Sequence, residues 1–348
     1  MSDGGQERRV GAATEGHDDT AQPLQFQFQF GDLAGEIHSA TLPTTHVHHP
    51  ATARRHHQEE GGAWPGVSDY VGAMGTRDGN RYLVTPEERD HFEQHGYVHL
   101  RAVLTDSELA GIETVYDSFM RGEIDVRGKD LNDMVTGEHG TDPSAYAIFN
   151  VMVPRTYYPA WQGNIFEQVG HSIAEQLCGE GMTLDFDQLL AKQPGRQDAV
   201  FAWHQDQAYW INTDDRRTAT CWLALDDTSP ENGCLQFLPG SHREPVRPHR
   251  PAAGDRATQH TLVTELRPGE VPRPVSIRRG DITVHNEGIL HGSGGNSSPD
   301  NRRRAYINAF RSIDTVRQER ALGFTHSHND HGDVLNQVDG LRASGGAT

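Results

Sequence analysis

The sequence has few cysteines, no long hydrophobic run and a deficit of positive charge, and each shortage excludes a class of protein. Its only three cysteines, Cys178, Cys221 and Cys234, lack CxxC spacing, so neither a disulfide framework nor a zinc knuckle is expected. No stretch of about 18 apolar residues is present, which argues against a transmembrane helix. The N-terminus has no basic start followed by an apolar segment, so we expect no secretory signal and a reduced, cytoplasmic compartment.

The charge balance limits the kinds of partner. The 348 residues contain 31 Lys and Arg against 49 Asp and Glu, for a formal net charge of −18. Binding to nucleic acid or to an anionic membrane surface needs an excess of basic residues. We therefore expect a small-molecule substrate and neither of those partners, while the oligomeric state is left open.

Composition changes along the chain and predicts three regions. Residues 1–80 are polar and lack sustained periodicity, so we interpret them as a flexible or extended arm. Within the arm, Gln25–Phe30 alternates strictly and could add an edge strand. Residues 81–315 are expected to form the ordered domain, and residues 316–348 a polar tail. The arm also carries histidines without fixed ligand spacing, interpreted as solvated rather than metal-binding: His38, His46, His48, His49, His56 and His57.

The first part of the ordered domain reads as helical. Thr85 and Thr105 each begin a capping box, and the first helix should end at Gly96. Tyr97–Leu100 reads as a short strand, and Ile165–Cys178 as a third helix.

Beyond Met182, short strands separated by turn residues predict a mainly β sandwich or jelly roll with flanking helices. The expected strands are Leu184–Lys192, Val200–Gln205, Ala219–Leu225, Cys234–Phe237, Val275–Ile277, Asp281–His285 and Arg303–Phe310.

A histidine with an acid two residues later is common in this chain and is weak evidence alone. The pairs begin at His17, His57, His91, His204, His242, His285 and His328. His204 stands out because it lies in an apolar strand flanked by aromatic residues. On a strand, His204 and Asp206 face the same side about 7 Å apart and can share one metal ion. Val200 and Ala202 are small and are expected on that face, leaving room beside the metal.

The third ligand should come from a distant strand, and the segment after Gly280 offers His285 and His291. Two imidazoles and one carboxylate form the facial triad of non-haem iron(II) oxygenases. Catalytic zinc can use the same donors, so the ligand types alone leave the metal open.

A basic residue that follows the second histidine in the sequence favours the oxygenase over a zinc enzyme. Arg303 shares a strand face with Ala305, Ile307 and Ala309, whereas Arg302 and Arg304 lie on the other face. A guanidinium at the end of a small apolar face suits a buried carboxylate of a cofactor, although a plain basic turn is the alternative.

Several stretches resemble the phytanoyl-CoA dioxygenase family of iron(II)/2-oxoglutarate oxygenases, between about Tyr82 and Phe310. They are Leu83-Val-Thr-Pro-Glu-Glu, Phe92-Glu-Gln-His-Gly-Tyr-Val, Asp187-Gln-Leu-Leu-Ala-Lys-Gln-Pro-Gly, Trp222-Leu-Ala-Leu-Asp-Asp, Glu231-Asn-Gly-Cys-Leu, Pro239-Gly-Ser-His and His291-Gly-Ser-Gly. Phe201-x-Trp-His-x-Asp206-x-x-x-Trp is similar to the ectoine hydroxylase version of the metal strand.

This resemblance implies a double-stranded β-helix (jelly roll, cupin-like) and iron ligands His204, Asp206 and His291, with His285 the weaker candidate. It also implies an arginine that binds 2-oxoglutarate, for which the usual spacing indicates Arg302 and the strand pattern indicates Arg303. We favour Arg303 because the alternation of the strand agrees. Further contacts with 2-oxoglutarate are expected from Gln188 and Lys192.

The implied enzyme uses Fe(II), 2-oxoglutarate and O2 to hydroxylate a small molecule, or to cyclise it oxidatively. Because Asp206 is present, no metal position is vacated for chloride, and halogenation is not expected. Trp203, Tyr209 and Trp210 are candidate substrate contacts, with core or lid packing as the alternative. We favour a tailoring enzyme of secondary-metabolite (antibiotic) biosynthesis. The rival classes are a zinc- or manganese-dependent hydrolase or isomerase on a cupin-like barrel, and a non-catalytic binding module.

Overall fold

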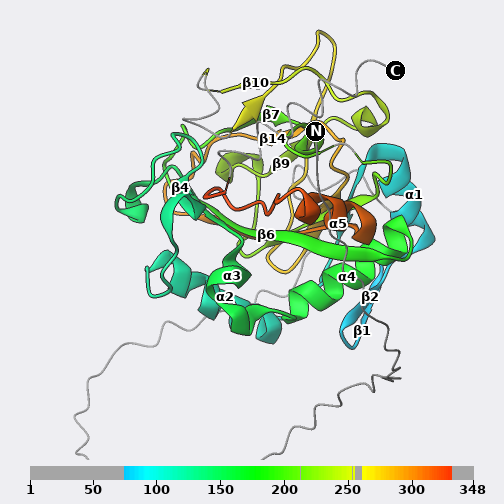
Figure 1. Cartoon of the computed structure of the whole chain (residues 1–348), viewed down its shortest axis with the longest axis horizontal. Helices are drawn as coiled ribbons and strands as arrows, with labels where there is room; N and C mark the ends of the chain where they lie inside the picture. The colour runs from blue at the N-terminus through cyan, green and yellow to red at the C-terminus, as the bar shows by residue number, and fades with distance from the viewer. Residues whose placement is uncertain (1–73, 212, 253, 255–260, 331–348) are drawn as a thin grey trace, which may run out of the picture. The chain divides into compact units, whose positions relative to one another are not determined.

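A seven-stranded antiparallel sheet forms the main layer, in the order β3-β13-β8-β15-β6-β5-β4. The computed structural model describes residues 74–211, 213–252, 254 and 261–330; the alternating Gln25–Phe30 and the histidines of the N-terminal arm lie outside them. A second sheet, in the order β12-β9-β14-β7, faces the first, and a hydrophobic core that includes Trp222, Phe237 and Ile307 lies between them. Figure 1 shows β7, β9 and β14 on one side of β6 and helices α2, α3 and α4 on the other.

The elements have the following bounds. The strands are β1 Thr76–Asp78, β2 Arg81–Leu83, β3 Tyr97–Leu100, β4 Leu131–Asp133, β5 Ile148–Met152, β6 Met182–Lys192, β7 Phe201–His204, β8 Thr218–Ala224, β9 Leu235–Phe237, β10 Arg250–Pro251, β11 Leu262–Val263, β12 Arg273–Pro274, β13 Ile282–His285, β14 His291–Ser293 and β15 Arg303–Ser312. The α-helices are α1 Pro86–His95, α2 Asp106–Met120, α3 Pro154–Tyr157, α4 Ile165–Cys178 and α5 Ile313–Ala321. The 3₁₀ turns are η1 Gly128–Asp130, η2 Pro143–Ala145, η3 Pro159–Trp161, η4 Asp206–Ala208, η5 Pro230–Asn232 and η6 Ser241–Arg243.

The helices cover the outer face of the main sheet. The capping boxes at Thr85 and Thr105 form as predicted, and the first helix ends at Gly96 in the left-handed conformation. Helix α4 buries Phe166 and Ile173 in the outer core, and each such fully buried side chain contributes about 1.5–3 kcal/mol. This packing holds the main sheet in place. The inner face of the sheet forms one side of the site described below.

Two antiparallel strand pairs set the register of the site. Along β15 and β6, Arg303 lies directly opposite Lys192. Along β14 and β7, His291 lies directly opposite His204. The first pair belongs to the main sheet and the second to the smaller sheet, so the space between the sheets receives side chains from both.

The mainly β prediction is confirmed, with two differences in detail. Val275–Ile277 is not a strand: Val275 and Ile277 are buried, so their alternation reflects packing of a loop, and the ladder is made by β12 instead. Helix α5 and the segment up to Asp330 fall largely in the region expected to be a polar tail. The buried residues of α5 are Thr315 and Glu319, so the helix has no apolar stripe that could have revealed it.

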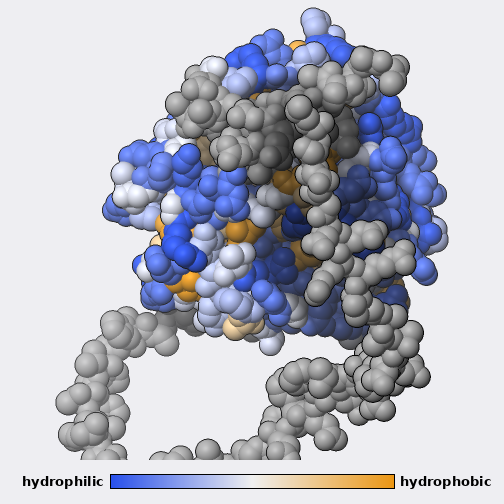
Figure 2. All heavy atoms as spheres, in the orientation of Figure 1, coloured by the Kyte–Doolittle hydropathy of each residue, from blue (hydrophilic) through white to orange (hydrophobic). Residues whose placement is uncertain are grey.

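The outer surface is mostly polar. No helix within the described residues is long and apolar enough to cross a membrane. In Figure 2 the hydrophilic colours dominate the described part of the visible face, and apolar residues are confined to small patches.

Candidate functional site

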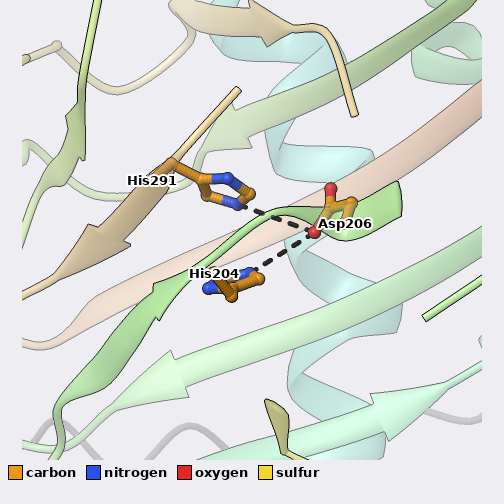
Figure 3. A group of neighbouring side chains, drawn as sticks. All are labelled: His204, Asp206 and His291. Atoms are coloured by element: carbon orange, nitrogen blue, oxygen red, sulfur yellow. Dashed lines mark ion pairs between the residues drawn. The ribbon is translucent and has the colours of Figure 1, made fainter. Parts of the chain in front are cut away.

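Three predicted ligands meet between the two sheets. His204 ends β7, Asp206 begins the turn η4, and His291 begins β14. Asp206 Oδ1 lies 3.3 Å from His204 Nε2 and 3.7 Å from His291 Nε2. Figure 3 shows both rings directed toward the Asp206 carboxylate. Their ligand atoms lie within 4.8 Å of one another, close enough to surround one metal ion.

Backbone carbonyls fix the tautomer of both histidines. His204 Nδ1 lies 2.7 Å from the carbonyl of Ala202, and His291 Nδ1 lies 3.1 Å from the carbonyl of Ile289. A carbonyl oxygen can only accept, so each Nδ1 donates its hydrogen and each Nε2 keeps its lone pair. Both lone pairs face Asp206, which is the orientation that a metal ligand requires.

The charges at this point also suit a divalent cation. Burial alone would raise the pKa of Asp206, but His291, His204 and His285 hold it well below its usual range, so the carboxylate is ionised. Burial and the neighbouring His204 keep the pKa of His291 well below its usual value, so its ring is neutral. Neutral imidazoles and an ionised carboxylate are the protonation states in which these groups bind metal.

A β-bulge changes which side chains of β7 face the site. His291 pairs with His204 and Ser293 with Phe201, so three steps along β7 match two steps along β14. The expectation that Val200 lies beside the metal is therefore wrong: Val200 is 50% exposed. Phe201 lines the cavity instead.

His285 is a third imidazole at the same carboxylate. It comes from β13, is buried, and places Nε2 3.5 Å from Asp206 Oδ2. It is not part of the three-residue group whose ligand atoms converge, so His291 rather than His285 completes that group.

Two buried basic side chains lie together near the cavity: Arg303 lines it, and Lys192 lies opposite Arg303 on the neighbouring strand. Arg303 donates Nε to the carbonyl of Gly233 at 3.2 Å and Nη2 to Ser293 Oγ at 3.4 Å, while Nη1 has no hydrogen-bond partner among the described residues. Lys192 donates Nζ to Ser293 Oγ at 2.6 Å and to the carbonyl of Gly294 at 2.5 Å. Burial lowers the pKa of Arg303 to about 10, and burial together with Arg303 lowers that of Lys192 well below its usual value.

These two cations have no acidic counterpart. Within the described residues, no carboxylate forms an ion pair with Arg303 or Lys192, although both are almost completely buried. A buried guanidinium without an ion-paired carboxylate is costly, so the Arg303 end of the cavity suits an anionic ligand.

The cavity connects the cations to the convergent histidines. It is lined by Phe186, Gln188, Leu190, Phe201, His204, Asp206, Thr220, Trp222, Leu235, His285, His291, Gly292, Ser293, Arg303 and Ile307. Gln188 lies on its wall and donates Nε2 to Asn150 Oδ1 at 2.6 Å. Arg302, the alternative anchor, is exposed and lines a separate surface hollow.

The three aromatic residues expected near the substrate lie in different environments. Trp203 is half-buried and is not among the residues that line the cavity. Tyr209 meets the ring of His204 edge-on at 6.0 Å, and its hydroxyl accepts from Leu262 N at 2.8 Å. Trp210 is buried beneath the Arg311 guanidinium, which lies 4.7 Å from its ring centre. Core packing thus accounts for Trp210, whereas Tyr209 makes a ring contact with the predicted ligand His204 although it does not line the cavity.

A second group of ionisable side chains, all buried except Arg320, was not predicted from the sequence. This charge cluster comprises Asp185, Glu287, Arg311, Glu319, Arg320 and His326. It joins the main sheet to α5 and to the loop between His285 and His291. No sequence motif marks it, because its members lie far apart in the chain and are polar.

Every member of the charge cluster has an oppositely charged neighbour. Arg311 forms ion pairs with Asp185 at 3.4 Å, with Glu287 at 3.2 Å, and with Glu319. Asp185 also binds Arg320 at 2.5 Å and His326 at 2.8 Å. Although burial alone would lower it, Asp185 and Glu319 raise the pKa of His326, so the ring carries a proton where a metal would otherwise bind.

Comparison with known proteins gives consistent matches. A family model described as Phytanoyl-CoA dioxygenase (PhyH) matches residues 92–305, more than half of the chain. The "Probable alpha-ketoglutarate-dependent hypophosphite dioxygenase" of Stutzerimonas stutzeri is 26% identical over 228 residues, 64% of this chain and 76% of that protein. The crystal structure of EvdO2 from Micromonospora carbonacea var. aurantiaca complexed with 2-oxoglutarate is 26% identical, with a TM-score of 0.52, and covers 66% of this chain and 92% of that one.

A further solved structure, EctD from S. alaskensis with bound Fe, has a TM-score of 0.52 at 18% identity and covers 72% of this chain and 84% of that one. At that identity the likeness concerns the fold. Together with EvdO2 it confirms the predicted jelly roll with flanking helices.

Proposed function

We infer the function from one premise: the chain belongs to the phytanoyl-CoA dioxygenase family. This membership confirms the predicted class, an iron(II)/2-oxoglutarate-dependent dioxygenase that uses O2. The rival classes, a zinc or manganese hydrolase and a non-catalytic module, are not favoured by these relatives. The roles of individual residues and the kind of substrate follow as proposals.

We propose that His204, Asp206 and His291 are the iron ligands. The residues fit this metal, because two imidazoles held through Nδ1 by backbone carbonyls direct their Nε2 atoms toward one carboxylate. These three side chains would hold the metal and would leave it able to bind a co-substrate and dioxygen as well.

The observation that carries the proposal is the pair of unbalanced cations beyond these ligands. Ser293 lies two residues after His291 on β14, and its hydroxyl contacts both Lys192 and Arg303. A short molecule with a carboxylate at each end would therefore reach from the cations to the metal. 2-Oxoglutarate has this form. Arg303 would bind its distal carboxylate with the unpaired Nη1, and Lys192 and Gln188 would assist.

Bound iron and 2-oxoglutarate would supply the activation of dioxygen that drives oxidation of the substrate. The chain's own residues orient and shield this chemistry. Phe186, Phe201 and Ile307 give the cavity apolar walls, which exclude water from the reacting end. Arg303 and Lys192 place the co-substrate in one direction only.

For the substrate, we propose a small molecule of secondary metabolism, such as an antibiotic intermediate, that is hydroxylated or oxidatively cyclised. Tyr209, at the edge of His204, is the best-placed of the aromatic candidates to contact it. Arg302 is proposed to lie outside the site because it is exposed.

The remaining proposals concern the setting of the enzyme. We propose a cytoplasmic location, supported by three cysteines that form no disulfide. The net charge of −18 supports the absence of nucleic-acid and membrane partners. We propose that residues 81–315 contain the catalytic domain, to which β1 and α5 add packed segments at its two ends.

A screen for succinate release would test the function. The purified enzyme, iron(II), 2-oxoglutarate and O2 are incubated with candidate small molecules, and succinate and oxidised product are measured together. We expect a subset of compounds to raise succinate formation, with none formed when iron or 2-oxoglutarate is omitted. Activity that persists with zinc and without 2-oxoglutarate would instead identify a hydrolase.

A further inference from the structure

The third imidazole at Asp206, His285, is not one of the proposed iron ligands, and the role inferred for it here rests on the proposed function. We propose that His285 is a positioning residue that holds the second oxygen of Asp206, so that this carboxylate binds iron through one oxygen only. His285 would act through Asp206 rather than touch the metal or the substrate.

The two oxygens of Asp206 face different partners. Oδ1 is the oxygen nearest to both proposed histidine ligands, at 3.3 Å from His204 Nε2 and 3.7 Å from His291 Nε2. Oδ2 faces His285 Nε2 at 3.5 Å. A metal on the Oδ1 side would therefore leave Oδ2 for a hydrogen bond from His285.

His285 also differs from the two proposed ligands in how its ring is held. His204 and His291 each donate Nδ1–H to a backbone carbonyl, which commits Nε2 to be an acceptor. Neither ring nitrogen of His285 has a hydrogen-bond partner within the described part of the chain. Its hydrogen is thus free to reside on Nε2, where Asp206 Oδ2 is the nearest acceptor.

The backbone around His285 is rigid enough for such a role. Strand β13 lies between β3 and β8, with His285 opposite Tyr97 on one side and Thr220 on the other. The ring is 2% exposed and packs near Phe237, at 5.5 Å between ring centres. A side chain buried in the middle of a sheet cannot swing away, so it fixes the angle of Asp206.

The consequence concerns the number of open positions at the metal. A carboxylate bound through both oxygens takes two positions and leaves fewer for 2-oxoglutarate and dioxygen. Removing a residue that hydrogen-bonds to a metal ligand typically changes metal affinity or activity by about 10- to 100-fold. His285 would have an effect of this size.

The test uses the full-length protein and iron(II) under anaerobic conditions, with and without 2-oxoglutarate. His285→Phe removes the donor and keeps an aromatic ring, whereas His285→Gln keeps an N–H donor near the position of Nε2. His99→Phe is the matched control, because His99 is a buried histidine on the neighbouring strand, paired with Asp281 at 2.8 Å and absent from the cavity lining. The readouts are iron affinity, the 2-oxoglutarate charge-transfer band and the unfolding temperature.

We expect His285→Phe to bind iron about 10- to 100-fold more weakly and to shift the charge-transfer band, with His285→Gln close to the wild type. His99→Phe should lose thermal stability but keep the affinity and the band of the wild type. Wild-type affinity and band in His285→Phe would overturn the proposal. So would a complete loss of iron binding in both His285 variants, as expected of a direct ligand. If the wild type bound no iron at all, the proposed function itself would fail first.

Discussion

The two buried groups of charged side chains are built from the same residue types, yet they differ in how their charges are balanced. In the charge cluster around Arg311, every carboxylate meets a cation, and three of its members, Asp185, Glu319 and His326, even lie close enough to hold a metal. At the cavity, Arg303 and the neighbouring Lys192 are buried together, and neither forms an ion pair with a carboxylate in the described part of the chain.

The difference separates a structural network from a binding site. A buried charge is costly unless it is paired, so a cluster that is balanced internally can persist as part of the fold. A buried charged group without an oppositely charged partner can instead bind a ligand of opposite charge. Convergence of donors alone would have marked both groups as metal sites. The cations that already occupy Asp185 exclude that role for the charge cluster.

The largest effect is expected from breaking the site at its carboxylate. Asp206→Ala removes one proposed iron ligand, so iron binding and succinate formation should fall by more than the roughly 100-fold typical of supporting residues. Iron content and succinate release measure this, and circular dichroism checks the fold. Full activity in this variant would refute the assignment of the ligands.

Breaking the charge cluster should instead affect stability. Arg311→Leu leaves Asp185, Glu287 and Glu319 without their common partner, and we expect a loss of about 3–5 kcal/mol of unfolding free energy. Urea denaturation measures this. Arg317→Leu is the matched control because the Arg317–Asp314 pair is 70% exposed on both sides, and it should change stability by less than about 0.5 kcal/mol. If both variants lowered the unfolding free energy equally, the charge cluster would contribute no more to stability than an exposed ion pair.

Removing Arg303 from the cavity should weaken co-substrate binding and leave stability largely unchanged. Arg303→Leu should raise the KM for 2-oxoglutarate about 10- to 100-fold, as a charged hydrogen bond of roughly 1.5–3 kcal/mol is lost. It should not reduce stability as Arg311→Leu does, because Arg303 leaves behind no acidic partner among the residues that the structure describes. Arg302→Leu is the control and should leave KM unchanged. A larger effect at Arg302 would favour the alternative anchor.

The charge cluster should also make stability depend on pH. Burial raises the pKa of Glu287 from 4.5 to about 8. Between these values the folded protein holds a proton that the unfolded chain has lost, so this contribution is complete below pH 4.5 and is lost as the pH rises toward 8. Glu287→Gln should therefore flatten the decline of unfolding free energy across this window, measured by urea denaturation at several pH values. An unchanged slope would contradict the assignment.

The sequence predicted the parts of the site that follow from simple alternation. Arg303 and Gln188 line the cavity because strand parity holds along the regular pairing of β15 with β6, which also places Lys192 opposite Arg303. Parity failed at Val200, because the β7 bulge is created by pairing with a strand ninety residues away and leaves no local signal.

The charge cluster could not be predicted for a related reason. Buried residues are normally detected by apolar periodicity, and α5 buries Thr315 and Glu319 instead. His326 likewise looked like a solvated tail residue, although Asp185, from the middle of the chain, holds it. Long-range pairing of polar groups becomes visible only once the strands are in place.

Gly233 has a consequence for how the co-substrate site can change through mutation. Its backbone carbonyl, not a side chain, accepts from Arg303, so no substitution of a side chain can simply delete this acceptor. Its φ of 80° and the Gly294 carbonyl, 2.5 Å from where a Cβ would lie, oppose any replacement of the glycine. Variants that alter the affinity for 2-oxoglutarate should therefore be recovered at Ser293, Lys192 or Arg303 and be rare at Gly233. The hydrogen bond from Arg303 to Gly233 is therefore hard to lose by mutation, and mutations at Gly233 offer little means of adjusting the affinity for 2-oxoglutarate.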